Sequence, residues 1–299
     1  MSLASFPEEL VEHILADAVI ASPAPSLRAS WHTPLDLRTR VAPLLVSSSF
    51  HRIAVPLFYH TVVIHTPGQS KALLQALHKQ PSLARSVRRL VLLAPAETDI
   101  EILQLLAHVH YLDITLPLED REFGLAGALH GLHNLEELVI RKGAATYLSQ
   151  RGPRAVLDAL AGVITSCPKL DSVTIAFPLS ADHSLSPLVD ALTSASSLTT
   201  LRTPVPSFWS PTLLNISSNP ALQALCLGDD LSGKSAEHRR PVMASSLFLS
   251  AARQHGRLSD LIRAGTSVVG WRSRAWTMGS VDLGNPPAVN AEARFDSSC

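Results

Sequence analysis

The stretch Leu135-Glu-Glu-Leu138-Val-Ile140 decides the fold, because its apolar–x–x–apolar–x–apolar spacing recurs through the middle of the chain. Side chains alternate along a strand, so the last two apolar residues of each copy point to the same side. Successive copies start 22, 26, 35, 28 and 24 residues apart. The other copies are Val87/Leu90/Leu92, Val109/Leu112/Ile114, Leu170/Val173/Ile175, Leu198/Leu201/Thr203 and Leu222/Leu225/Leu227.

Helical periodicity fills the intervals between these strands, at residues 72–77, 100–107, 156–164 and 185–192. The copies resemble the leucine-rich repeat family in spacing and length, although the usual asparagine ladder is missing. This resemblance implies an irregular solenoid within an α/β fold, with parallel strands on one face and helices on the other.

In such a coil, the residues between the inward-pointing ones face the concave surface. We expect this surface to bind a target protein, although each position alone is also compatible with an ordinary solvated strand residue. The candidate target-binding residues are Asp113, Val139, Thr174, Arg202 and Cys226.

The first sixty residues read as a helix, a proline-containing loop and short helices, the last of which ends before Pro56, and then a strand at 61–64. The stretches Phe6-Pro-Glu-Glu-Leu-Val-Glu-His-Ile-Leu15, Leu44-Leu-Val-Ser-Ser-Ser-Phe-His-Arg-Ile-Ala54 and Leu57-Phe-Tyr-His-Thr-Val-Val-Ile64 resemble the F-box or F-box-like family in its fungal form. The resemblance implies a helical module that docks on the Skp-type adaptor of cullin-RING ubiquitin ligases. It makes these residues candidate contacts: Phe6, Pro7, Leu10, Ile14, Leu45, Val46 and Phe50. Alternatively, the helices only cap the open end of the repeats.

After the last repeat, apolar residues from Leu247 to Ile262 predict one helix, capped by Ser245 or Ser246, that closes the other end of the array. The segment from Lys234 to Trp276 contains eight basic residues and only two acidic ones, which we interpret as a solvated basic surface. We expect residues beyond 279 to form a flexible tail. The predicted units are therefore an F-box-like module at 1–60, repeats at 61–230 and a cap with tail at 231–299.

The segment Gly228-Asp-Asp-Leu-Ser-Gly-Lys-Ser235 matches the phosphate-loop pattern, in which backbone amides and a lysine hold phosphates. Such a loop opens directly into a helix, whereas Pro241 would disrupt the second turn, so a turn leaving the last repeat is the preferred interpretation. A nucleotide-binding protein remains the least favoured of three hypotheses.

The composition limits other chemistry. The 25 basic and 25 acidic residues balance, and the three cysteines are scattered, which favours neither a nucleic-acid partner nor a disulfide framework. No metal-ligand spacing, catalytic motif or membrane-length apolar run is found. We therefore expect a cytoplasmic or nuclear protein with no enzyme activity, no cofactor, no metal and no membrane partner.

The favoured hypothesis is a substrate receptor that links an unknown target protein to a cullin-RING ubiquitin ligase through a Skp-type adaptor. The alternative is a plain leucine-rich-repeat scaffold without a ligase connection.

Overall fold

The chain forms an α/β structure around one parallel sheet. The computed structural model describes residues 7–20, 38, 40–118, 124–143, 145–179, 183–228, 242–243, 247–266 and 268–269. The strands of the sheet are β1 (Thr61–Ile64), β2 (Arg89–Leu92), β3 (Tyr111–Leu116), β4 (Glu137–Lys142), β5 (Ser172–Ile175), β6 (Thr200–Thr203) and β7 (Ala224–Leu227). They lie side by side in chain order and all neighbouring pairs are parallel.

The sequence spacing fixes the register of this sheet. Leu90, Leu112 and Leu138, the second apolar residues of their copies, are direct partners across neighbouring strands, and the same row continues through Val173, Leu201 and Leu225. A shift by one residue would turn these side chains to the opposite face. The predicted strands of all six copies are confirmed.

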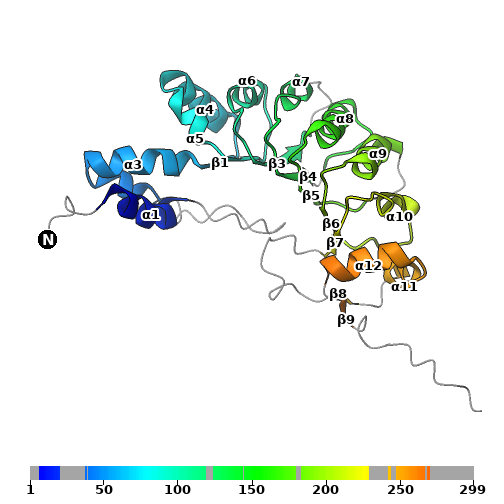
Figure 1. Ribbon diagram of the computed structural model, residues 1–299. Coiled ribbons are helices and arrows are strands. Elements are labelled where there is room, and N and C mark those ends of the chain that lie inside the picture. The colour runs from blue at the N-terminus through cyan, green and yellow to red at the C-terminus, as the bar shows by residue number, and fades with distance from the viewer. Residues whose placement is uncertain are drawn as a thin grey trace, which may run out of the picture.

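Helices cover one face of the sheet. Figure 1 shows the strands along the inner side of an arc and the helices along its outer side. The predicted helical segments are confirmed, because each lies within or largely within an observed helix. All the helical elements described between β1 and β7 are α4 (Pro67–Lys79), α5 (Ser82–Ser86), α6 (Thr98–Leu105), α7 (Leu125–Leu129), α8 (Arg151–Ser166), the 3-10 turn η3 (His183–Leu185), α9 (Ser186–Ser194) and α10 (Pro211–Ile216).

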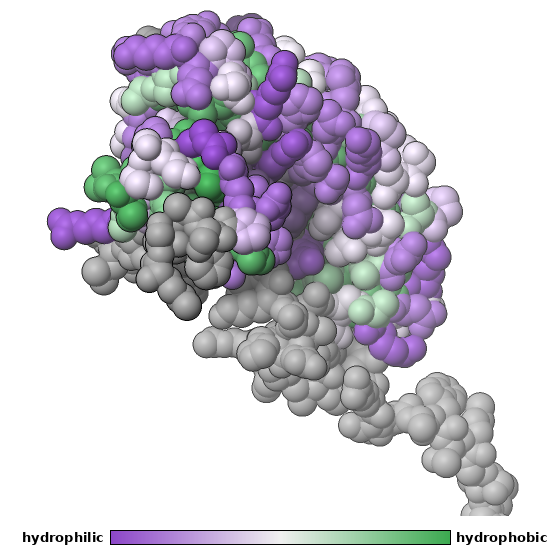
Figure 2. Space-filling model, turned by 60° about the vertical axis from the view of Figure 1, so that its left-hand side comes forward, coloured by the Kyte–Doolittle hydropathy of each residue, from purple (hydrophilic) through white to green (hydrophobic). Residues whose placement is uncertain are grey.

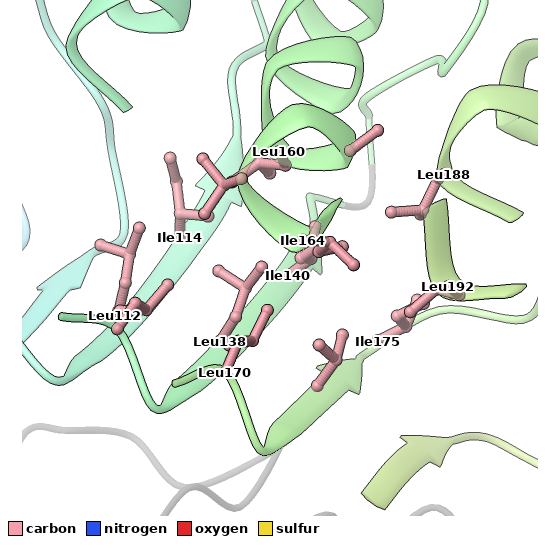
Figure 3. Close-up of a cluster of buried hydrophobic side chains, with 14 of the residues drawn as sticks. Leu112, Ile114, Leu138, Ile140, Leu160, Ile164, Leu170, Ile175, Leu188 and Leu192 are labelled. Atoms are coloured by element: carbon pink, nitrogen blue, oxygen red, sulfur yellow. The ribbon is translucent and has the colours of Figure 1, made fainter. Parts of the chain in front are cut away.

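The main core lies between the sheet and these helices. Figure 3 shows Leu138 and Ile140 of β4 pointing toward Ile164 of α8, with Ile175 of β5 and Leu192 of α9 alongside. All five side chains are 0–1% exposed, and each contributes about 1.5–3 kcal/mol by leaving water. One continuous cluster of this kind runs from β1 to the C-terminal helices.

The N-terminal helices have a small core of their own. They are α1 (Glu8–Val19), the 3-10 turn η2 (Ala42–Leu45) and α3 (Ser48–Tyr59). Leu15 and Val19 of α1 pack against Ile53 and Ala54 of α3. Ser47 caps α3 by accepting a hydrogen bond from the Phe50 amide at 3.2 Å.

Helix α3 is longer than expected, because it continues through Pro56 instead of ending before it. Proline removes one backbone hydrogen bond of the helix. Val55 and Tyr59, on either side of Pro56, pack against the main core. This packing holds the last turn of α3 in place and outweighs the missing bond.

The C-terminal cap also differs from the prediction, since two helices replace one. Helix α11 (Leu247–Ala252) ends before a turn, and α12 (Gly256–Gly265) follows. Trp209 stacks on Phe248 and on His255, with ring centroids 5.7 Å and 5.0 Å apart, which holds the turn between the helices. The predicted caps Ser245 and Ser246 lie outside the described residues. Among the described residues, Val242–Met243 (β8) and Val268–Val269 (β9) form a separate parallel pair.

Helix α12 closes the free edge of β7. The Thr266 hydroxyl, just after the helix, donates to the Leu225 carbonyl at 3.0 Å and accepts from the Leu227 amide at 2.7 Å. These backbone groups would otherwise lie on an unpaired sheet edge. Gly265 permits this approach, since a Cβ there would lie 2.5 Å from the Leu225 carbonyl oxygen.

Candidate protein-docking surfaces

The first candidate site is an apolar surface on the N-terminal helices. Leu10 and Ile14, one helical turn apart on α1, are 52% and 68% exposed, while Leu15 on the same helix is buried. Leu45 and Val46, at the end of η2, are 81% and 62% exposed. We call these four residues the N-terminal apolar surface. Figure 2 brings this end of the molecule forward and shows hydrophobic residues on its outside.

This surface contains several of the large hydrophobic residues that are exposed in the described part of the chain. Of the ten large hydrophobic residues that are exposed in the described part of the chain, these four come from two short segments near its beginning. Single exposed apolar residues are normal on proteins, whereas several gathered together indicate an interaction site. Four of the seven residues proposed as adaptor contacts therefore form this exposed surface.

The remaining three predicted contacts have different environments. Pro7 is exposed at the start of α1. Phe50 is partly buried and packs against the core of the N-terminal helices, so it supports this surface more than it extends it. Phe6 lies outside the described residues.

Polar contacts hold the N-terminal helices together around this surface. Glu8 at the start of α1 accepts a hydrogen bond from Arg52 of α3 at 2.8 Å, and this bond lowers the pKa of the Glu8 carboxyl. Both side chains are well exposed, so the pair adds little stability and mainly orients the helices. Arg40 donates to the Val19 carbonyl at 2.6 Å and to the Phe58 carbonyl at 3.2 Å, which ties the ends of α1 and α3 together.

The second candidate site is the face of the sheet opposite the helices. The five residues predicted to contact a target form one row across β3 to β7: Asp113, Val139, Thr174, Arg202 and Cys226 are successive partners in register. Asp113, Val139 and Thr174 are nevertheless buried, at 0%, 1% and 3% exposed, while Arg202 and Cys226 are partly exposed. The first three therefore lie beneath the surface that a partner would meet.

A charged network explains the burial of Asp113. Arg141 donates two hydrogen bonds to its carboxylate, from Nε to Oδ1 and from Nη2 to Oδ2, both at 2.7 Å. Tyr111 also donates to it, at 3.4 Å, and the guanidinium of Arg89 stacks 3.8 Å from the Tyr111 ring centroid. Burial raises the pKa of Asp113, against the opposing effect of Arg141. Tyr111 further packs with Val91 and Val139 in a small apolar cluster.

A pocket of about 720 Å³ opens where the first five strands begin. Its walls come from the residues just before and at the start of β1 to β5, which the parallel register brings into adjacent rows. Burial and the positive charges of Arg89 and Arg88 lower the pKa of His60 in this pocket. The lining residues are His60, Arg88, Arg89, His110, Tyr111, Glu136, Glu137, Lys169, Asp171 and Ser172.

Backbone hydrogen bonds hold this pocket wall in a regular form. The His60 carbonyl accepts from the amides of both Arg88 and Arg89, each at 3.0 Å. The same doubled bond joins the Arg88 carbonyl to His110 and Tyr111, and the His110 carbonyl to Glu136 and Glu137. The side chains of the pocket are therefore carried on a rigid frame.

Sequence analysis did not identify this pocket, although a signal was present. In five of the six copies, two polar, charged or tyrosine residues stand immediately before the second apolar position, as Arg88-Arg89 and Glu136-Glu137 do. The predicted concave face contains one residue per strand and does not include the strand starts. Only the register shows that these separate pairs are neighbours.

The described residues contain no group of three or more His, Cys, Asp or Glu side chains arranged to hold a metal ion. The phosphate-loop match lies outside the described residues apart from Gly228, which directly follows β7. Among the helices that the structure describes, none has the length and apolar character needed to cross a membrane. Comparison with protein-family models and with curated proteins found no match to this chain.

Proposed function

We propose that this chain is a non-catalytic substrate receptor, in which an F-box-like N-terminal module binds a Skp-type adaptor and an irregular leucine-rich-repeat solenoid binds a target protein. The observation that carries the proposal is the exposure of Leu10, Ile14, Leu45 and Val46. These residues are the ones that the F-box resemblance assigns to adaptor contact.

The same surface argues against a purely structural role for the N-terminal helices. A cap at the end of a repeat array hides the first apolar layer and presents a polar outer face to water. Helix α3 does cover the end of the array, through Val55 and Tyr59. The outer side, however, carries Ile14 and Leu45, which are apolar and exposed. A partner protein on this side would remove them from water.

The sheet face supports the second half of the proposal. The strands run parallel in chain order, and the described helices that connect them lie on one face of the sheet, so no described connecting helix covers the other face (Figure 1). Binding an adaptor at one end and a target on this face would hold the target near the ligase by tethering, without any chemistry on the chain itself.

Co-expression of the full chain with a Skp-type adaptor, followed by size-exclusion chromatography, tests the proposal. We expect a stoichiometric complex for the unchanged chain. Ile14→Asp and Leu45→Asp should abolish co-elution by placing a carboxylate in the apolar interface. Circular dichroism should show that both variants stay folded, because exposed positions tolerate such changes within about 0.5 kcal/mol.

Leu247→Asp is the matched control, since Leu247 is 68% exposed, as Ile14 is, but lies at the opposite end of the fold. This variant should bind the adaptor like the unchanged chain. A well-folded chain that elutes without the adaptor would leave the plain repeat scaffold as the better explanation.

A further inference from the structure

The pocket at the strand starts is divided into a basic half and an acidic half. Arg88 and Arg89 belong to β2 and its approach, on the side of β1 to β3. Glu136 and Glu137 belong to β4, and Asp171 precedes β5. Because the strands follow chain order across the sheet, the two kinds of charge are separated along it. Lys169 at the far rim offsets only part of the acidic half.

The basic half contains a donor that is already held in place. Arg89 stacks on the Tyr111 ring, and its Nε is buried with no hydrogen-bond partner. A buried donor without an acceptor is costly, and it leaves this guanidinium with unused hydrogen-bonding capacity. The lowered pKa of His60, for which the neighbouring arginines are partly responsible, is consistent with uncompensated positive charge on this side.

The two halves neutralise each other only slightly. Across the described part of the chain, the contacts that join them run through His110, whose Nε2 lies 3.2 Å from Arg88 Nη1 and whose Nδ1 lies 3.1 Å from the Glu136 carboxylate. No salt bridge within that part engages Arg89 or Glu137. A partner can therefore satisfy charges on both sides of the pocket.

The strand spacing sets the separation of these charges. Neighbouring strands lie about 4.8 Å apart, and β2 is two to three strands from β4 and β5, which gives roughly 10–14 Å. An extended peptide covers about 3.3 Å per residue, so this distance corresponds to about three or four residues. A phosphate backbone would fit less well, because Glu136, Glu137 and Asp171 would repel it.

We propose that this pocket binds an extended peptide segment of the target protein, with an acidic side chain over Arg88 and Arg89 and a basic side chain, three or four positions away, over Glu136 and Glu137. This inference rests on the proposed receptor function and specifies the chemistry of the target. Charges placed in this way select partners and orient them more than they add affinity.

Selection from a phage-displayed library tests the proposal, with the full chain as bait and random peptides of about twelve residues, which are long enough to span the pocket. The unchanged chain should enrich peptides that carry one acidic and one basic residue three or four positions apart. Arg88→Glu with Arg89→Glu should instead enrich peptides with two basic residues at that spacing. Glu136→Lys with Glu137→Lys should enrich peptides with two acidic residues.

Matched charge reversals on the helical side provide the control. Lys71→Glu with Lys79→Glu on α4, and Asp158→Lys with Asp190→Lys on α8 and α9, alter exposed residues away from the pocket. These variants should keep the preference of the unchanged chain. The enriched peptide should also bind the pocket variants at least about tenfold more weakly in fluorescence anisotropy.

The proposal is overturned if the unchanged chain shows no such enrichment, or if the pocket variants enrich the same peptides as the controls. Adaptor co-elution separates this result from the receptor function. If the chain co-elutes with the adaptor but enriches no such peptides, only the pocket assignment is contradicted. If it enriches the peptides but does not co-elute with the adaptor, the ligase connection is contradicted.

Discussion

Arg141 of β4 donates two hydrogen bonds of 2.7 Å to the carboxylate of Asp113 on the adjacent β3, and the Asp113 side chain is completely buried. The pair lies on the sheet face opposite the helices, beside the apolar cluster of Val91, Tyr111 and Val139. A buried ion pair with this bidentate geometry fixes the relative position of two strands, and removing one partner leaves the other charge uncompensated.

Asp113→Asn should therefore destabilise the fold strongly. The amide keeps the shape of the carboxylate but leaves the Arg141 guanidinium, only 12% exposed, without its anion. The expected loss is about 3–5 kcal/mol in the free energy of unfolding, measured by urea denaturation.

Asp260→Asn is the matched control for this prediction. Asp260 also pairs with an arginine, Arg263 at 3.0 Å, but both side chains are mostly exposed. The expected loss there is below about 1 kcal/mol. Equal effects of the two substitutions would show that the buried pair contributes no more than a surface pair.

Gly265→Ala should loosen the closure of the sheet edge. The added methyl would lie 2.5 Å from the Leu225 carbonyl carbon and oxygen and 2.8 Å from the Cys226 amide nitrogen. These are backbone atoms that cannot rotate away, so α12 must shift, which costs about 1–3 kcal/mol. Thermal unfolding should show the loss, and amide hydrogen exchange should show faster exchange at Leu227, whose amide bonds to Thr266.

Gly256→Ala tests whether this effect comes from crowding or from glycine itself. Gly256 opens the same helix, and a Cβ at this position meets nothing within 4 Å. Alanine is the better helix former, so stability should stay the same or rise slightly. A loss at Gly256 comparable to that at Gly265 would contradict the close-approach explanation.

His60 should make stability depend on pH in the weakly acidic range. Burial, together with Arg89 and Arg88, lowers the pKa of His60 in the folded protein below its ordinary value of 6.5. The unfolded chain then binds a proton more readily, so stability is lost as the pH falls below about 6.5. His60→Gln should reduce the drop in melting temperature between about pH 7.5 and about pH 5.5.

The exposed His133 provides the comparison for that measurement. His133→Gln should leave the pH dependence of the melting temperature as it is in the unchanged chain. If His60→Gln keeps the full drop, the loss of stability at low pH comes from other groups.

Much of the fold followed from local patterns. The triplets around Leu112, Leu138 and Val173 placed their strands, and helical spacing placed α4, α6, α8 and α9, because burial of one side of a strand or helix leaves a period in the sequence. The helices before β1 were likewise anticipated. Local periodicity is sufficient here because each strand and helix of the sheet region packs mainly against its neighbours in the chain.

The remaining features depend on contacts between distant residues. Trp209 stacks on residues of both sides of the turn between α11 and α12. Val55 and Tyr59 pack against the main core, which lets α3 continue past Pro56. Neither contact leaves a local pattern, so the sequence predicted one C-terminal helix and an earlier end of α3.

By itself, then, the sequence determined the order of strands and helices in the sheet and the side of each that faces the main core. Only the tertiary structure decided that Asp113 is buried under Arg141 and that the charges at the strand starts form a pocket with two halves. The reason is physical: periodicity records which side of an element leaves water, whereas pairing between strands decides which distant side chains meet.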